Sequence, residues 1–120
     1  MTDIATDDDL RAALTAADRY PVVLFKHSRT CPISSMAQMS IGQLDAPDDP
    51  DVYRVVVQSA RTLSNAIAER FGVRHESPQV LVVHNGAVVH HASHMGVSAT
   101  RIRRAAANAL EGTGGETPDA

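Results

Sequence analysis

VVLFKHSRTCPIS, residues 22–34, carries the local signals that decide the fold. Its first four residues are apolar, which is typical of a strand buried on both faces of a sheet. The polar turn KHSR follows. Thr30 can then cap a helix in which Pro32 occupies the first turn, where its missing N–H costs little. The stretch therefore predicts a central strand, a polar turn and a helix that opens at Cys31.

Residues on either side of this stretch predict three more helices and three more strands. Thr6 can cap an amphipathic helix, and Gly72 stands where a helix C-cap belongs. Asn85 and Gly86 form the strongest hairpin signal in the chain. The expected elements are helices at 6–17, 31–44, 63–71 and 98–110 and strands at 22–25, 52–57, 79–84 and 87–90.

The order of these elements, α-β-α-β-α-β-β-α, defines an α/β fold. Strands separated by helices imply right-handed parallel crossovers, whereas the final hairpin adds antiparallel strands. We therefore expect a central mixed four-stranded sheet with helices on both faces. The fold would be a single domain of residues 1–112, followed by a disordered tail, rich in Gly, at 113–120.

The composition limits the possible partners. With 120 residues and 43% hydrophobic content, the chain has material for one core. A net charge of -3, the lack of Trp and a content of only 2 Tyr and 2 Phe argue against binding to nucleic acid or to an acidic membrane surface. The acidic start of the sequence contains neither a secretory signal nor a transmembrane run, so we expect a cytoplasmic protein.

Cys31 is the single cysteine, so it cannot form a disulfide within the chain. A lone cysteine is often a small core residue. This one follows a strand and begins a helix, where free N–H groups and the positive end of the helix dipole stabilise a thiolate. Lys26 or Arg29 would favour ionisation further if its side chain turned toward the sulfur. We therefore predict that Cys31 is a reactive nucleophile.

Several short motifs make the chain similar to known proteins. Three motifs look like parts of thioredoxin-fold proteins. The active-site turn corresponds to TCPIS (30–34), the cis-proline loop to ESPQ (76–79) and the final hairpin to NG (85–86). More narrowly, this chain resembles the YtxJ-like monothiol family, also called bacilliredoxin C. The motifs that carry this resemblance are FKHS (25–28), LSN (63–65) and HESPQ (75–79). The resemblance spans roughly residues 8–110 and implies a thioredoxin-like fold.

The resemblance also implies a function. It implies a monothiol thiol-disulfide oxidoreductase that removes bacillithiol, a glucosamine-linked cysteine thiol of certain bacteria, from mixed disulfides on other proteins. Cys31 would be the catalytic nucleophile, and a cis peptide bond would precede Pro78. No bound cofactor or metal is expected; bacillithiol would be an external co-substrate, and S-thiolated client proteins would be the partners. The residues expected to contact substrate are Lys26, Thr30, Pro32, Ile33, Ser77 and Pro78.

Ser34 occupies the position at which two-cysteine thioredoxins carry their resolving thiol. Serine cannot form that disulfide, so a monothiol route is required. Cys31 would attack a mixed disulfide, retain the small thiol and be regenerated by a second, external thiol. Beyond its lack of sulfur we assign Ser34 no role, and its hydroxyl is expected to form a local hydrogen bond.

Two alternative functions stay open. Some monothiol glutaredoxins share an iron–sulfur cluster between two protomers, but they carry a C-G-F-S turn, whose Gly and Phe are replaced here by Pro32 and Ile33. The chain could instead be a redox-inert module that binds a partner protein, in which case Cys31 would be unreactive. A zinc site is not expected, because neighbouring strand positions face opposite ways. Solvent-exposed imidazoles are expected instead at His84, His90, His91 and His94.

Overall fold

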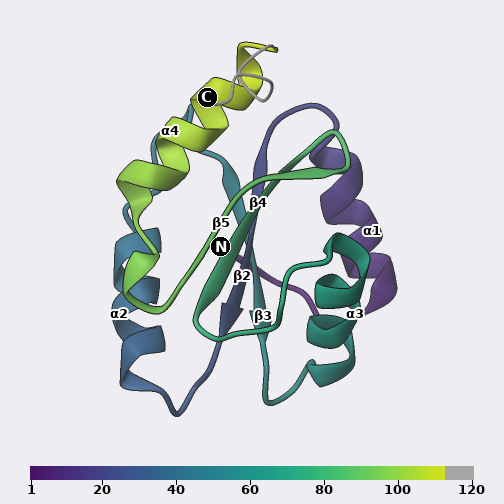
Figure 1. The fold of residues 1–120 in the computed structure, drawn as a ribbon, viewed down its shortest axis with the longest axis vertical. Helices are drawn as coiled ribbons and strands as arrows, with labels where there is room; N and C mark the ends of the chain where they lie inside the picture. The colour runs from purple at the N-terminus through teal and green to yellow at the C-terminus, as the bar shows by residue number, and fades with distance from the viewer. Residues whose placement is uncertain (113–120) are drawn as a thin grey trace.

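Helices cover both faces of one sheet in the structure, a computed structural model that describes residues 1–112 (Figure 1). The five strands, in the spatial order β1-β3-β2-β4-β5, are β1 (Thr2–Asp3), β2 (Val22–His27), β3 (Asp51–Val56), β4 (Gln79–His84) and β5 (Ala87–Ser93). The helices are α1 (Asp7–Ala16), α2 (Pro32–Ile41), α3 (Arg61–Phe71), the 3-10 turn η1 (His94–Gly96) and α4 (Ala99–Leu110). The tail predicted to be disordered, 113–120, lies outside the described residues.

The sheet is mixed, as predicted, but it has one more strand than predicted. The parallel crossover expected across α3 is also wrong, because β3 runs parallel to β2 whereas β4 runs antiparallel to it. β2 and β3 are parallel, whereas β4 is antiparallel to both β2 and β5. The additional strand, β1, is a correction to the four-stranded sheet. It pairs with β3, and Asp3 Oδ1 lies 2.6 Å from Arg54 Nε. Two exposed polar residues carry no strand pattern, so the sequence could not reveal this pairing.

Each face of the sheet buries its own apolar cluster. α1 and α3 cover one cluster, which includes Leu24, Leu63 and Ile67. α2 and α4 cover the other, which includes Phe25 and Ile102. Successive strand residues point to opposite faces, so Leu24 and Phe25 each supply one cluster. This explains why β2 is a continuous apolar run, and the two helix pairs lie on opposite sides of the sheet in Figure 1.

Three local sequence signals stand where they were expected, at the start of α1, at the end of α3 and in the hairpin turn. Thr6 Oγ1 accepts the Asp9 N–H at 3.1 Å, and the Asp9 carboxylate accepts the Thr6 N–H at 3.2 Å, which completes a capping box at the start of α1. Gly72 ends α3 with φ of 66°. Asn85 and Gly86, with φ of 53° and 77°, form the predicted hairpin turn, whose positive φ values suit the twist of the strands.

Two predicted boundaries around the active-site turn are wrong. β2 does not end before KHSR but continues through Lys26 and His27, because both residues pair with β3. Both side chains are buried, so the polarity of these residues concealed their place in the strand. α2 ends at Ile41, with Gly42 as its C-cap, before the predicted end at Leu44.

None of the helices within 1–112 is long and apolar enough to cross a membrane.

Candidate active site

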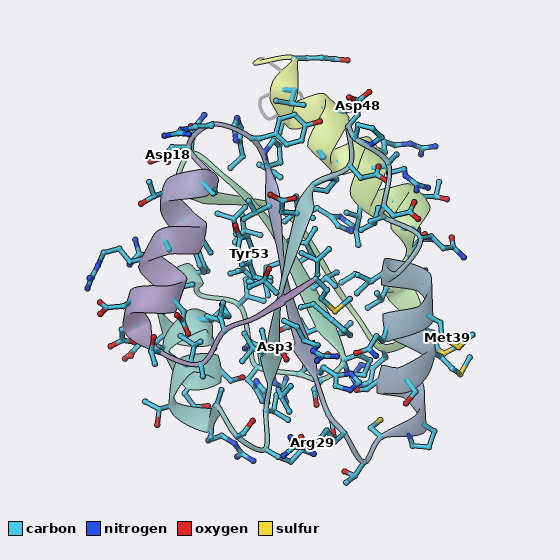
Figure 2. All side chains as sticks on the ribbon, turned by 180° about the vertical axis from the view of Figure 1, so that it is seen from behind. Asp3, Asp18, Arg29, Met39, Asp48 and Tyr53 are labelled. Atoms are coloured by element: carbon cyan, nitrogen blue, oxygen red, sulfur yellow. The ribbon has the colours of Figure 1, made fainter. Side chains whose placement is uncertain are left out.

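Cys31 lies at the N-terminus of α2, after the turn that follows β2. Its backbone is extended, with φ of -105° and ψ of 117°, and Pro32 is the first helical residue. Cys31 is therefore itself the N-cap, one position later than the predicted cap, Thr30. The residue is partly exposed, so a disulfide in solution can reach it. Figure 2 shows Arg29, two residues before Cys31, near the lower end of the molecule, and this residue is exposed.

The first turn of α2 lowers the pKa of Cys31. The Ser34 N–H is the largest cause; partial burial opposes it, and the Ile33 N–H and the Ser34 hydroxyl add to it. The neutral thiol makes no capping hydrogen bond, but these N–H groups have no partner in the helix and favour a negative charge on the sulfur. Neither Lys26 nor Arg29 contributes to the lowered pKa. The activation therefore comes from the helix terminus.

Ser34 fills the position of the missing second cysteine and is fully buried. Its Oγ accepts the Ser28 N–H at 3.2 Å, across the turn between β2 and α2. A backbone N–H only donates, so the hydroxyl hydrogen of Ser34 stays free to point toward Cys31. The hydroxyl thus closes the turn from the inside of the molecule.

Gln58 closes the same turn from the outside, and sequence reasoning missed it. Gln58 lies just after β3 and is exposed. Its Oε1 accepts the Arg29 N–H at 3.1 Å, while its Nε2 donates to Ser28 Oγ at 2.9 Å and to Thr30 Oγ1 at 3.3 Å. No motif signals this residue. The contact exists because β3 runs parallel to β2 and ends beside it.

Lys26 lies in the core instead of beside the sulfur. Its side chain is fully buried, and Nζ lies 3.1 Å from His75 Nδ1. Ser64 Oγ, on α3, lies 3.0 Å from the same nitrogen. An ammonium group only donates, so Nδ1 accepts and the ring carries its proton on Nε2. The expected contact between Lys26 and substrate is corrected here, because the side chain has no exposed surface.

We call Lys26, Ser64 and His75 the Lys26 cluster. Burial governs the charges of its two titratable side chains, Lys26 and His75. Burial lowers the pKa of Lys26 to about 8. Burial also lowers the pKa of His75, and the positive charge of Lys26 lowers it further. At neutral pH the cluster is therefore a charged lysine that donates to a neutral imidazole. It joins β2, α3 and the loop that leads into β4.

The loop before β4 contains the cis peptide bond that the resemblance implies, between Ser77 and Pro78. The next residue, Gln79, pairs with Lys26 near the end of β2. The loop therefore lies at the same end of the sheet as the turn that leads to Cys31. Gln79 and Pro78 are buried, whereas Ser77 is partly exposed.

The residues predicted to contact substrate thus fall into two groups. Those with exposed surface are Thr30, Pro32, Ile33 and Ser77. The first three lie within two residues of Cys31 in sequence, and the fourth lies on the cis-proline loop. The remaining two, Lys26 and Pro78, are buried and can act on a substrate only through other residues.

Four histidines lie in or beside the hairpin, at positions 84, 90, 91 and 94. Within residues 1–112, no group of three or more His, Cys, Asp or Glu side chains is placed to hold a metal ion. His91 and His94 are exposed as expected, but His84 and His90 are partly buried. His84 Nδ1 donates to the Ala17 carbonyl at 2.8 Å, so this side chain ties β4 to the end of α1.

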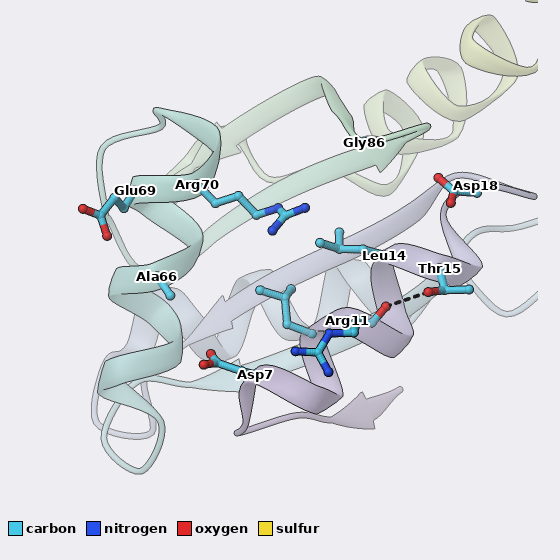
Figure 3. Close-up of a pocket in the computed structure, with 10 residues that line it drawn as sticks. Asp7, Arg11, Leu14, Thr15, Asp18, Ala66, Glu69, Arg70 and Gly86 are labelled. Carbon is cyan, nitrogen blue, oxygen red and sulfur yellow. Dashed lines mark hydrogen bonds between the residues drawn. The ribbon is translucent and has the colours of Figure 1, made fainter.

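A hollow of about 610 Å³ lies between α1 and α3, away from the thiol (Figure 3). Leu10, Leu14 and Ala66 line it, together with charged side chains that include Arg11 and Arg70. It opens on the face of the sheet opposite α2. It therefore takes no part in the candidate active site.

The parallel and antiparallel strands around β2, with a cis proline entering β4 and a lone thiol starting α2, make this a thioredoxin-fold protein of the monothiol kind. The sequence profile of the family described as Monothiol bacilliredoxin BrxC matches residues 2–102, and the chain belongs to this family. The resemblance stated from the sequence motifs is thus confirmed. Membership supports a thiol oxidoreductase.

Solved structures agree with the thioredoxin-like fold. A protein named as an oxidoreductase with a thioredoxin fold has a TM-score of 0.79 and 31% identity, covering 87% of this chain and 91% of that chain. A thioredoxin variant from Halobacterium salinarum NRC-1 has a TM-score of 0.70 and 16% identity, covering 88% of this chain and 86% of its own. Thioredoxin from Fasciola hepatica has the same TM-score and identity, covering 89% and 97%. The predicted fold is confirmed.

Proposed function

We propose that this protein is a cytoplasmic monothiol oxidoreductase that removes bacillithiol from mixed disulfides on client proteins. The observation that carries the proposal is the position of Cys31, a partly exposed thiol whose pKa is lowered by the start of α2. Membership of the monothiol bacilliredoxin family supports bacillithiol as the small thiol. No bound cofactor is needed, because thiol–disulfide exchange involves only sulfur groups.

The first step transfers the small thiol to the protein. The Cys31 thiolate attacks the bacillithiol sulfur of the mixed disulfide, a new S–S bond forms, and the bond to the client sulfur breaks. The client leaves as a thiolate and takes a proton from water. The lowered pKa of Cys31 favours this step, since only the thiolate attacks.

The second step regenerates the thiol with an external reductant. The chain contains one cysteine, so no internal thiol can displace the bound bacillithiol. A free low-molecular-weight thiolate attacks the bacillithiol sulfur of the adduct and releases Cys31 as a thiolate. The product is a disulfide of two small thiols. Over the cycle the client sulfur is reduced and one free small thiol is oxidised, while the bacillithiol sulfur stays in a disulfide throughout.

We assign the substrate contacts to the exposed residues at this end of the sheet. Pro32 and Ile33 adjoin the sulfur in the first turn of α2, and Thr30 precedes it. The backbone of Ser77 is available to pair with a bound thiol ligand. This assignment also explains why the contact residues come from two separate segments, since β2 and β4 are paired neighbours.

The test mixes the reduced protein with a client protein that carries bacillithiol on a single cysteine. The reduced protein should release the client thiol and gain the mass of one bacillithiol on Cys31, as measured by intact-protein mass spectrometry. Cys31→Ser should do neither. Ser35→Ala, which changes an exposed neighbour on α2, should behave like the unmodified protein.

The same client carrying glutathione separates the substrate from the chemistry. Faster transfer from the bacillithiolated client supports the proposal. Equal rates would keep the oxidoreductase activity but reject bacillithiol as the preferred thiol. If Cys31 gains no adduct from either client, the proposed function is wrong, and the redox-inert alternative takes its place.

A further inference from the structure

Gln58 binds three successive residues before the thiol. One carboxamide accepts from the Arg29 backbone and donates to the hydroxyls of Ser28 and Thr30, over distances of 3.1, 2.9 and 3.3 Å. The two hydroxyls lie 3.4 Å apart and can bond each other. A single side chain therefore holds the whole segment that connects β2 to Cys31.

The orientation of this carboxamide follows from its partners. The Arg29 N–H can only donate, so it must face the Gln58 oxygen. The Gln58 nitrogen then faces the two hydroxyls, which must accept. All three contacts are satisfied in this orientation, whereas the flipped amide would place two donors together at Arg29. Gln58 thus has a defined place despite its exposure to solvent.

The backbone also brings Gln58 to the turn. The Val57 N–H donates to the His27 carbonyl at 2.9 Å, which extends the pairing of β2 and β3 to the residue before Gln58. On the inner side, Ser34 Oγ accepts the Ser28 N–H at 3.2 Å. The turn is held from both sides, and the buried hydroxyl alone would leave Arg29 and Thr30 without these side-chain bonds.

We propose that Gln58 is a positioning residue for Cys31, holding the Ser28–Thr30 turn so that the sulfur stays against the N-terminus of α2. The inference rests on the proposed function only in taking Cys31 as the reacting group. The Ile33 and Ser34 N–H groups can stabilise the thiolate only while the N-cap keeps its geometry. Loosening the turn should therefore reduce thiolate formation without removing any apolar core contact.

The test compares Gln58→Leu with Gln43→Leu. Gln43 is exposed just beyond α2, and its side chain makes no hydrogen bond with other residues of the described chain. Alkylation of Cys31 by iodoacetamide, measured against pH, reports the thiolate directly. Gln58→Leu should move the midpoint upward and lower the rate below that midpoint about threefold, in proportion to the lost thiolate fraction. Gln43→Leu should leave both unchanged.

Amide hydrogen exchange shows whether the turn itself has loosened. The Arg29 N–H should exchange faster in Gln58→Leu, whereas Gln58→Glu keeps an acceptor for it and should retain the protection. The thermal melting temperature should stay close to that of the unmodified protein in both variants, because residue 58 is exposed. Unchanged alkylation and unchanged Arg29 exchange in Gln58→Leu would overturn the proposal.

These measurements need neither bacillithiol nor a client protein. If Gln58→Leu shifts the alkylation profile but the unmodified protein removes no bacillithiol, the positioning role of Gln58 stands and the proposed substrate is rejected. Removal of bacillithiol at full rate by Gln58→Leu, with an unshifted profile, would do the opposite. The two proposals therefore fail in different experiments.

Discussion

Lys26 and Cys31 lie close together in the sequence, and the pKa of each is lowered, but for opposite physical reasons. Burial lowers the pKa of Lys26 to about 8, because it disfavours the charged ammonium. The N–H groups of α2 lower the pKa of Cys31, because they favour the charged thiolate. A lowered pKa thus makes the charged form of Lys26 less populated and the charged form of Cys31 more populated.

The comparison separates stability from reactivity. Lys26 and Ser64 of the Lys26 cluster are fully buried, and the cluster joins β2, α3 and the loop before β4, so its loss should affect folding more than chemistry. Cys31 is partly exposed and contributes little to the core, so its loss should affect chemistry more than folding. The loop that carries Ser77 depends on the Lys26 cluster, since His75 anchors it near the end of β2.

The largest expected effect is on chemistry. Cys31→Ala should lower the transfer of a small thiol by roughly 10³-fold or more, which corresponds to about 4 kcal/mol of activation free energy. Its free energy of unfolding, from urea denaturation, should stay within about 0.5 kcal/mol of the unmodified value, as for other exposed sites. A large loss of stability would show that Cys31 is a packing residue and would break the comparison.

A substitution in the Lys26 cluster should have the reverse effect. His75→Ala leaves the buried Lys26 ammonium without its ring partner and should cost about 2–3 kcal/mol of unfolding free energy. The rate at which iodoacetamide alkylates Cys31 should change by less than twofold. Combining Lys26→Met with His75→Ala should cost less than the sum of the single changes, because the unpaired charge is gone. Additive costs would show that the two residues are not coupled.

The pH dependence of stability tests the burial of Lys26. The unfolded chain keeps the ordinary lysine pKa near 10.5, whereas the folded value is about 8. Between these values the unfolded state binds more protons, so the free energy of unfolding should rise with pH. We expect a gain of about 1–2 kcal/mol between pH 8 and pH 9.5, absent in Lys26→Met. A flat profile in both proteins would mean that Lys26 is hydrated.

Ser34 should show the smallest effect. Ser34→Ala removes the acceptor of the buried Ser28 N–H, at a cost of about 1 kcal/mol. It also removes a hydroxyl that lowers the pKa of Cys31, so alkylation below the midpoint should slow about twofold. Chemical denaturation and the alkylation profile measure the two losses. A loss as large as that of Cys31→Ala would give Ser34 a direct role in the reaction.

Much of the site could be predicted because its causes are local. The helix N-terminus that activates Cys31 is built from the residues that follow it, and Pro32 marks that terminus in the sequence. The cis bond before Pro78 was predicted through the family motif and not from the residues alone. The role of Lys26 was mispredicted, because its nearness in sequence to Cys31 does not show which face of β2 it occupies.

The sequence by itself determined the caps at Thr6 and Gly72, the hairpin turn and the reactive end of α2, since each depends on contacts within a few residues. Only the tertiary structure decided that Lys26 is buried against His75, 49 residues away, and that Gln58 holds Arg29, 29 residues away. Strand pairing brings these partners together. Because the register of the whole sheet sets all of these contacts at once, no local sequence pattern predicts any one of them.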